Sequence, residues 1–301
     1  MVRVTYLGPE GTNTHAAALA LHEEALREAA QGGAPLEFVP EATIRGVFEA
    51  VAAGRADRGV VPIENSTEGG VGPTLDSLFE LSPVISAEYV AEIHHFLLGR
   101  GDVLLDRVEQ VLSHPQALGQ CRGWLAAHLP HAAQIPVAST STAARLAAQD
   151  GRSVAIASEL AAQLNGLTVL HREIEDLEHN ATRFVMITSE DAPPTGSDKT
   201  SLVFTTPHER GALRRVLTIF DDAGLNLTRI ESRPLPRHRW QYAFFTDLEG
   251  SRHDAAVATA LHRLQDVCGT VKVLGSYPQS AQRALPPRGD AEGYASPGPT
   301  G

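Results

Sequence analysis

Short apolar runs alternate with helix-like patterns from residue 2 to residue 190, and this alternation is typical of an α/β region. The first three strand–helix units are expected at 2–7 and 14–30, at 36–40 and 44–53, and at 58–63 and 73–81. In a second set, one or two strands are expected at 84–98, and further strands at 110–113, 135–139, 153–157, 168–171 and 184–188. The helices of this set are expected at 115–129, 142–149 and 159–164.

The last third of the chain follows a different order. Residues 192–198, rich in Pro, Gly and Ser, predict a linker. The elements expected after it are strand 200–206, helix 209–223, strands 225–234 and 240–247, helix 254–267 and strand 271–277. This βαββαβ order is ferredoxin-like, a fold that says little about function by itself. Residues 279–301, rich in Pro, Gly and Ala, are expected to form a disordered tail.

Composition narrows the classes of partner. The 301 residues suggest about two domains, and 25 Lys+Arg against 36 Asp+Glu give a formal charge of −11. That charge argues against general binding to nucleic acid or to an anionic membrane. The chain starts directly with a strand-like run, has no apolar run of about 18 residues, and places its two cysteines, Cys121 and Cys268, far apart. We therefore expect a cytoplasmic protein with reduced thiols.

Polar groups emerge where predicted strands end. Gly8-Pro9-Glu10-Gly11-Thr12 follows a strand and opens a helix, so Gly11 and Thr12 could bring backbone N–H groups close to an anion. A plain capped turn would give the same pattern. The missing lysine and the incomplete G-x-G-x-x-G argue against a nucleotide site.

Two further strand ends carry candidate binding residues. Glu64, Asn65 and Ser66 follow the apolar run Gly59-Val60-Val61, and ligands collect at the carboxyl ends of strands in open α/β sheets. His114 and Gln120 follow the strand expected at 110–113, although His114 could simply cap the next helix.

The segment Asn180-Ala181-Thr182-Arg183-Phe184 enters an apolar strand and presents a hydroxyl beside a guanidinium. A surface turn would be the common interpretation of this segment alone. The acidic stretch from His171 to His179 could invite a metal, but a solvated loop is the preferred interpretation. The chain has no H-E-x-x-H, C-x-x-C or G-x-S-x-G motif.

Together these peptides and Glu231-Ser232-Arg233-Pro234, in this order, resemble prephenate dehydratase with a C-terminal ACT domain, from about Arg3 to Pro278. The resemblance implies a catalytic region at 1–191 with two lobes, similar to type II periplasmic binding proteins, the second lobe spanning about 76–170. It places the ACT regulatory domain at 199–278. The implied reaction is a carbon–oxygen lyase step of phenylalanine biosynthesis, in which prephenate gives phenylpyruvate, water and carbon dioxide without metal or organic cofactor.

The resemblance also implies roles for individual residues. Thr182 would assist loss of the ring hydroxyl, because a preorganised hydroxyl can donate to the departing oxygen. Arg183 and the Gly11–Thr12 loop would hold carboxylates, and Phe184 would pack beneath them. The residues implied to order the rest of the substrate are Glu64, Asn65, Ser66, His114 and Gln120.

The C-terminal motifs resemble those of phenylalanine-sensing ACT domains. The implied effector site comprises Gly211, Ala212, Leu213, Asn226, Leu227, Glu231, Ser232, Arg233 and Pro234. Arg210 stands where the family usually has proline, which leaves the loop shape open. By this resemblance L-phenylalanine binds between paired ACT domains, and we expect a homo-oligomer, a dimer or tetramer with the tetramer favoured.

Two alternatives stay open at this stage. Arogenate dehydratase acts on a substrate with an amino group in place of the keto group, and no residue in the sequence separates the two. A non-catalytic amino-acid sensor of the same fold is a second alternative, although it would not need the whole motif set. No helical segment precedes Arg3, so we expect no fused chorismate mutase.

Overall fold

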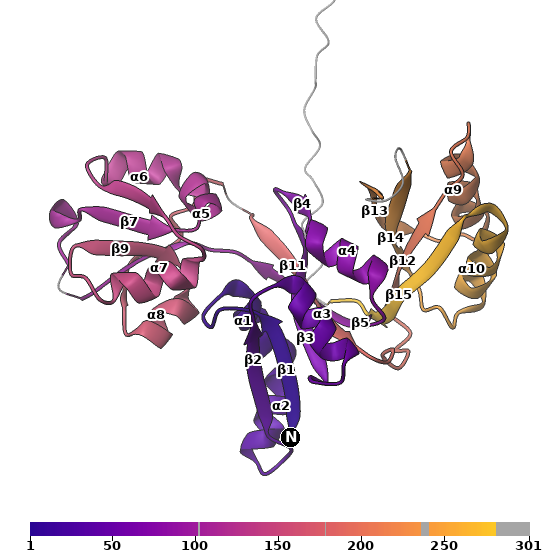
Figure 1. The fold of residues 1–301 in the computed structure, drawn as a ribbon, viewed down its shortest axis with the longest axis horizontal. Coiled ribbons are helices and arrows are strands. Elements are labelled where there is room, and N and C mark those ends of the chain that lie inside the picture. The colour runs from indigo at the N-terminus through magenta and orange to yellow at the C-terminus, as the bar shows by residue number, and fades with distance from the viewer. Residues whose placement is uncertain (102, 178, 236–240, 281–301) are drawn as a thin grey trace, which may run out of the picture.

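Three sheets organise the protein in the computed structural model, which describes residues 1–101, 103–177, 179–235 and 241–280 (Figure 1). The strand start expected at residue 240 and most of the tail expected at 279–301 lie outside these ranges. No helix within them is long and apolar enough to cross a membrane.

The first sheet has the strand order β2-β1-β3-β11-β5, and we call it and its helices the first lobe. Its strands are β1 (Val2–Leu7), β2 (Leu36–Glu41), β3 (Arg58–Asn65), β5 (Val84–Glu92) and β11 (Ala181–Thr188), with the short β4 (Gly69–Gly70) beside β3. Its helices are α1 (Asn13–Leu21), α2 (Glu23–Ala30), α3 (Ile44–Ala52) and α4 (Gly72–Glu80). β1, β2 and β3 are parallel, whereas β11 runs antiparallel to both of its neighbours.

Both faces of β11 are buried, each in a different core. Phe184 packs with Val60 and the alanines of α1 on one face. Val185 and Ile187 pack with α3 and α4 on the other face. Because side chains alternate along a strand, neighbouring residues of β11 belong to different environments.

The second sheet has the order β10-β6-β9-β7-β8 and forms the second lobe. Its strands are β6 (Phe96–Gly99), β7 (Gln110–Ser113), β8 (Ala133–Pro136), β9 (Ser153–Ala157) and β10 (Thr168–His171). Its helices are α5 (Pro115–Gln120), α6 (Arg122–His128), α7 (Thr140–Ala147) and α8 (Glu159–Asn165), together with the short 3₁₀ turn Leu105–Arg107. Two expected helices are each divided, at His22 between α1 and α2 and at Cys121 between α5 and α6.

The crossing between lobes corrects one expected boundary. The second lobe was expected to begin near residue 76, but β5 pairs with β11 along its whole length, so α4 and β5 belong to the first lobe. The apolar run 84–98, expected as one or two strands, forms two strands that belong to different sheets. The chain crosses between the lobes at Ile93-His94-His95. It returns between β10 and β11.

The third sheet, β13-β14-β12-β15, forms the C-terminal domain. Its elements are β12 (Asp198–Thr205), α9 (Ala212–Asp222), β13 (Leu227–Pro234), β14 (Tyr242–Glu249), α10 (Ala255–Val267) and β15 (Thr270–Pro278), in the expected βαββαβ order. The two helices pack on one face of this sheet through residues such as Val216, Phe220 and Leu264.

The opposite face of the third sheet packs directly on the first lobe. Val203, Phe245 and Tyr277 belong to the same buried cluster as α3, α4 and β5. Gly275 has φ +150°, and a Cβ there would collide with the backbone of Ile85. Glycine is therefore required where β15 crosses β5, and the C-terminal domain is firmly joined to the strands that carry the sequence motifs.

Candidate active site

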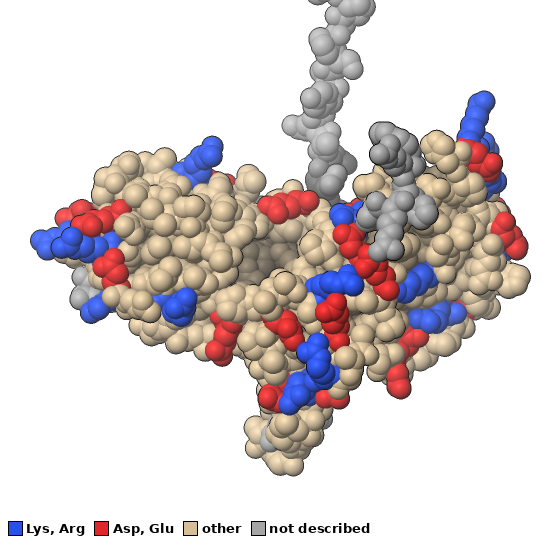
Figure 2. Space-filling view, viewed as in Figure 1, with Lys and Arg blue, Asp and Glu red and all other residues tan. Residues whose placement is uncertain are grey.

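A cleft of about 380 Å³ lies between the two lobes. Figure 2 shows a hollow between them whose visible wall is free of the blue and red of charged residues. The lining residues are Leu7, Gly8, Thr12, Asn13, Thr14, Ala42, Asn65, Ile93, His95, His114, Gln116, Ala117, Gln120, Ala138, Ser139, Thr140, Asn180 and Thr182. Among these described residues there is no lysine, arginine or carboxylate, so the wall is polar but almost uncharged.

Thr182 stands at the start of β11, opposite Asn65 at the end of β3. The Asn65 Oδ1 atom accepts from the backbone N–H groups of Thr67 at 3.0 Å and Glu68 at 3.2 Å. Backbone N–H groups can only donate, so they fix which end of the amide is the oxygen. The Asn65 Nδ2 atom must then donate to Thr182 Oγ1 at 2.9 Å. The Thr182 hydroxyl accepts this bond and keeps its own hydrogen free to donate into the cleft.

The same argument fixes the direction of the hydrogen bonds that connect Asn65 with side chains of the second lobe. Asn65 Nδ2 also donates to Asn180 Oδ1 at 2.9 Å, so the Asn180 amide nitrogen faces Gln120 Oε1 at 3.4 Å. Gln120 Oε1 therefore accepts, and His95 Nε2 donates to it at 2.7 Å. Burial lowers the pKa of His95, which favours the neutral imidazole. The Gln120 amide nitrogen is therefore the end of this side chain that can donate to another group.

Two helices of at least eight residues begin at this cleft. Thr12 caps α1 by accepting from the His15 N–H, and Ser139 caps α7 by accepting from the Thr142 N–H. The first N–H groups of a helix have no partner within the helix and carry partial positive charge. The helix N-termini capped by Thr12 and Ser139 thus bring partial positive charge to the cleft, whose described lining contains no lysine or arginine.

Within the loop Gly8–Thr12, Gly8 and Thr12 line the cleft, whereas Gly11 connects the two lobes. Gly11 has φ +81°, its N–H donates to His15 Nδ1 at 3.1 Å, and its carbonyl accepts from Ser158 of the second lobe at 3.0 Å. A Cβ at Gly11 would press against Ser141 of α7. His114 lines the cleft and caps α5, as its Nδ1 accepts from the Gln116 N–H at 3.3 Å.

The structure separates other expected site residues from the cleft. Arg183 and Glu64 lie on the opposite faces of their strands from Thr182 and Asn65, because adjacent strand residues alternate. The Arg183 guanidinium is bound to Glu88, Asp247 and Tyr277. It therefore does not reach a ligand in this cleft, and the expectation that it holds a substrate carboxylate is corrected by this placement.

The structure also places Glu64, Ser66 and Phe184, three of the residues expected to contact the substrate. Glu64 lies between Arg183 and Arg229, its Oε2 atom 3.6 Å and 3.4 Å from them. The Ser66 hydroxyl accepts from the Ala181 N–H at 2.9 Å and so fastens the start of β11 rather than lining the cleft. Phe184 is buried in the first-lobe core, on the same face of β11 as Thr182.

The acidic stretch is structural. Glu175 accepts from the His95 N–H at 2.9 Å, and Asp176 accepts from the Gly123 and Trp124 N–H groups at the start of α6. No metal-binding cluster of His, Cys, Asp and Glu occurs in the part of the chain that the structure describes.

The sequence analysis did not assign His95, Asn180 and Ser139 to the cleft. Their positions in the chain could have indicated them, because each lies next to a crossing between the lobes or just after a strand.

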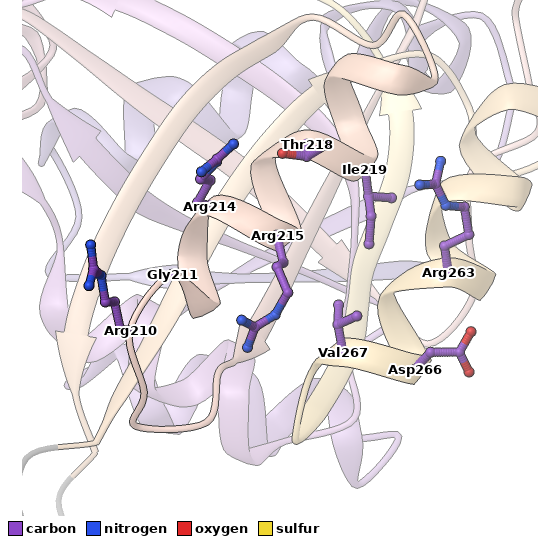
Figure 3. Close-up of a pocket in the computed structure, with 9 residues that line it drawn as sticks. All are labelled: Arg210, Gly211, Arg214, Arg215, Thr218, Ile219, Arg263, Asp266 and Val267. Atoms are coloured by element: carbon purple, nitrogen blue, oxygen red, sulfur yellow. The ribbon is translucent and has the colours of Figure 1, made fainter.

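The expected effector residues divide into two groups. Gly211, with φ +78°, begins α9 and lines a groove of about 660 Å³ between α9 and α10, where Arg215 and Arg263 also lie (Figure 3). Ala212 is buried and Leu213 packs into the domain core, while Asn226 is exposed before β13.

The Glu231-Ser232-Arg233-Pro234 motif points back to the first lobe instead. Glu231 pairs with Arg229 and lies against Gly70 of β4. Arg233 donates to the Asp76 carboxylate of α4 at 3.1 Å and 3.2 Å. Glu231 and Arg233 therefore join the two domains in a single chain.

Comparisons with known proteins agree with this arrangement. The family model described as prephenate dehydratase matches residues 4–192, and the ACT domain model matches residues 200–266. A bifunctional chorismate mutase/prephenate dehydratase of Aquifex aeolicus is 44% identical over 279 residues, which cover 93% of this chain and 74% of that protein.

Two solved structures are similar over nearly the whole chain. A prephenate dehydratase from Arthrobacter aurescens in complex with L-Phe has a TM-score of 0.82 and 36% identity, covering 92% of this chain and 90% of that one. GqqA, described as a novel type of quorum quenching acylase, has a TM-score of 0.78 and 31% identity, covering 93% and 98%. With these matches and the expected two-lobed α/β region followed by a ferredoxin-like domain, the chain belongs to the prephenate dehydratase family and carries a C-terminal ACT domain.

Proposed function

We propose that this protein converts prephenate to phenylpyruvate, water and carbon dioxide in the cleft between the lobes. In this reaction the C–C bond to one carboxylate breaks, its electron pair enters the ring, and the ring C–O bond breaks as the ring becomes aromatic. The departing hydroxide takes a proton and leaves as water. Aromatisation makes the step favourable, so the protein needs only to orient two carboxylates and assist the departing oxygen.

The observation that carries this proposal is the direction of the Asn65–Thr182 hydrogen bond. Because Thr182 accepts from Asn65, its own hydrogen is available to the departing oxygen. A bond donated to an alcohol oxygen also strengthens that alcohol as a donor. Threonine is too weak an acid to transfer its proton freely, but a positioned donor stabilises charge as it develops in the transition state.

The substrate carboxylates fit the cleft without a cation. The first N–H groups of α1 and α7, with the hydroxyls of Thr12, Ser139 and Thr140, provide donors on two sides of the cleft. The Gln120 amide nitrogen adds a further donor. No carboxylate lines the described wall, so the ammonium group of arogenate would find no counter-charge there. This absence favours prephenate over arogenate.

The chemistry of an acylase fits less well. Hydrolysis of an amide through a hydroxyl nucleophile needs a base within hydrogen-bond distance of that hydroxyl. Among the described residues, the side chain that contacts Thr182 Oγ1 is the Asn65 amide, while His95 and His114 are bonded to Gln120 and to the α5 backbone. Thr182 is therefore arranged as a donor and not as an activated nucleophile.

We also propose that L-phenylalanine inhibits the enzyme through the ACT domain in a homo-oligomer. β13 pairs only with β14 within the described chain, and Ile230 on it is exposed, so its other edge can receive a second copy. Gly211 and Asn226 lie at exposed positions on separate turns, as a site completed by a second subunit requires. Calorimetry with phenylalanine, with tyrosine as control, and sedimentation with and without effector test this part. Absence of phenylalanine binding would contradict it.

The catalytic proposal is tested with purified protein incubated separately with prephenate, arogenate and an N-acyl amide. We expect phenylpyruvate from prephenate, and much slower turnover of the other two. Thr182→Ala should lower kcat by about 10²–10³ with little change in KM, because it removes one donor aimed at developing charge. Circular dichroism and melting temperature should match wild type. Undiminished turnover by Thr182→Ala would remove Thr182 from its role.

A further inference from the structure

Arg183 follows Thr182 in sequence but points through the opposite face of β11 towards the C-terminal domain. Its Nε donates to Glu88 on β5 at 2.7 Å, its Nη1 to Asp247 on β14 at 2.5 Å, and its Nη2 to Tyr277 on β15 at 2.7 Å. Two of these three partners therefore come from the ACT domain. All three nitrogens of the guanidinium fork are engaged far from the cleft wall.

The partners of Arg183 form a closed ring of hydrogen bonds. Arginine can only donate and an ionised carboxylate can only accept, so the direction of each bond is fixed. Arg183 donates to the Tyr277 hydroxyl, Tyr277 donates to Ser201 Oγ at 2.6 Å, and Ser201 donates to Asp247 Oδ1 at 2.6 Å. Asp247 then accepts from Arg183, which closes the ring.

The ring is buried and its charges are balanced. The Arg183 side chain is 11% exposed, while those of Glu88 and Asp247 are 1% and 2% exposed. Lys199 on β12 donates to both Glu88 oxygens at 2.7 Å, so two cations face two carboxylates. Burial would raise the pKa of Asp247, but Arg183 and Arg229 outweigh burial and lower it, which keeps the carboxylate charged. Removing Arg183 or Asp247 would leave a buried charge unpaired.

We infer that Arg183 is a positioning residue for Thr182, and that the ACT domain holds the active-site end of β11 through the ring of Arg183, Asp247, Tyr277 and Ser201. Thr182 and Arg183 are consecutive residues of β11. If the partners that hold the Arg183 side chain move, Thr182 therefore moves relative to Asn65. A misplacement of about 1 Å in a catalytic group can cost about 100-fold in rate. The catalytic consequence rests on the proposed function, whereas the anchorage does not.

Through the ring, a movement of the ACT domain can change the position of Thr182 and thereby the reaction rate. Any shift of β14 or β15 relative to the first lobe must either stretch the bonds to Arg183 or carry β11 with it. No ligand need enter the cleft for this to change the rate. A role for Arg183 as a substrate ligand would instead require the guanidinium to leave three buried partners and cross the strand.

The test uses the full-length protein with Tyr277→Phe and Asp247→Asn. Tyr277→Phe removes one hydroxyl from the ring and keeps the buried aromatic side chain, and we expect kcat to fall about 10-fold or more with KM changed less than about threefold. Asp247→Asn should have the larger effect, because it leaves Arg183 short of a counter-charge.

The matched control is Thr200→Val. Thr200 is the neighbour of Ser201 on β12, is fully buried, and loses bonds to Ser276 and to the Gly250 carbonyl when replaced. Its side chain points away from the ring, so Thr200→Val should lower the melting temperature while leaving kcat within about twofold of wild type. If Tyr277→Phe and Thr200→Val had equal kcat, the positioning role would be overturned.

Hydrogen exchange separates this inference from the proposed reaction. Peptides covering residues 181–188 should exchange faster in Tyr277→Phe than in wild type and in Thr200→Val, whether or not prephenate is the substrate. Failure of wild type to turn over prephenate would refute the proposed function and leave this result standing. Unchanged exchange in both ring variants would refute the anchorage itself.

Discussion

Replacing Asn65 with aspartate reverses one hydrogen bond at the proposed reaction centre while changing almost no volume. In the wild type, the Asn65 amide nitrogen faces three oxygens, those of Asn180 and Thr182 at 2.9 Å and the Ala181 carbonyl at 3.2 Å. A carboxylate oxygen in that place has no hydrogen to donate, and it would face three oxygens that accept hydrogen bonds in the wild type. The Thr182 hydroxyl can relieve this repulsion only by turning to donate to the introduced carboxylate, which consumes the hydrogen needed in the cleft.

The expected magnitude follows from that single reversal. Loss of one preorganised donor costs about 10²–10³ in kcat, equivalent to about 2.7–4 kcal/mol. Asn65→Asp should therefore resemble Thr182→Ala, and the double variant should be little worse than either single variant, because both remove the same interaction. The free energy of unfolding should fall by about 1–3 kcal/mol, as buried acceptors lose their donor.

The assay is the pH dependence of kcat for prephenate. Protonation of the introduced carboxylate gives it an O–H group that can donate to Thr182, so the activity of Asn65→Asp relative to wild type should rise as the pH is lowered. Thr67→Ala is the control, because it removes the Thr67 hydroxyl bond to Asn65 while the backbone N–H groups still orient the amide. Its kcat should stay within about threefold of wild type. A relative activity of Asn65→Asp that did not vary with pH would refute the argument from hydrogen-bond direction.

Two further predictions concern stability. Burial lowers the pKa values of His15, His22 and His95 below the ordinary 6.5, so the unfolded state binds more protons and the free energy of unfolding should fall as the pH drops below about 6.5. The bond to Glu175 raises the pKa of His94, so His94 alone would make the folded state more stable as the pH falls. This single histidine opposes the three buried ones and should only reduce their effect. Melting temperatures at about pH 7.5 and about pH 5.5 measure the slope, and His22→Phe should reduce it; an unchanged slope would count against the buried-histidine explanation. Gly275→Ala should lower the free energy of unfolding by about 1–3 kcal/mol, because its Cβ meets the Ile85 backbone. Gly196→Ala, with φ +85° but open space around it, should cost less, and equal denaturant midpoints for the two variants would contradict the assigned close contact.

The sequence by itself determined the order of elements and the strand ends at which the site lies. Periodicity separates strands from helices. The carboxyl ends of parallel strands must meet at one edge of a sheet, which brought Thr12 and Asn65 of one sheet into view together, while His114 was marked by the end of a strand in the other sheet. The motif Thr182-Arg183 was visible because it enters an apolar strand, and its first residues reach the same edge of the sheet because that strand runs antiparallel to β3. What periodicity could not provide was the number of breaks in long apolar runs, so the run 84–98 looked like part of one lobe.

Only the tertiary structure decided which of two neighbouring residues faces the cleft. Asn65 and Glu64, like Thr182 and Arg183, alternate across a strand whose two faces are both buried, so no apolar-to-polar contrast marks the cleft side. The packing of the C-terminal domain on one face settled the matter by supplying Asp247 and Tyr277 to Arg183. Those partners lie 64 and 94 residues away in sequence, and local pattern carries no information about contacts at that separation.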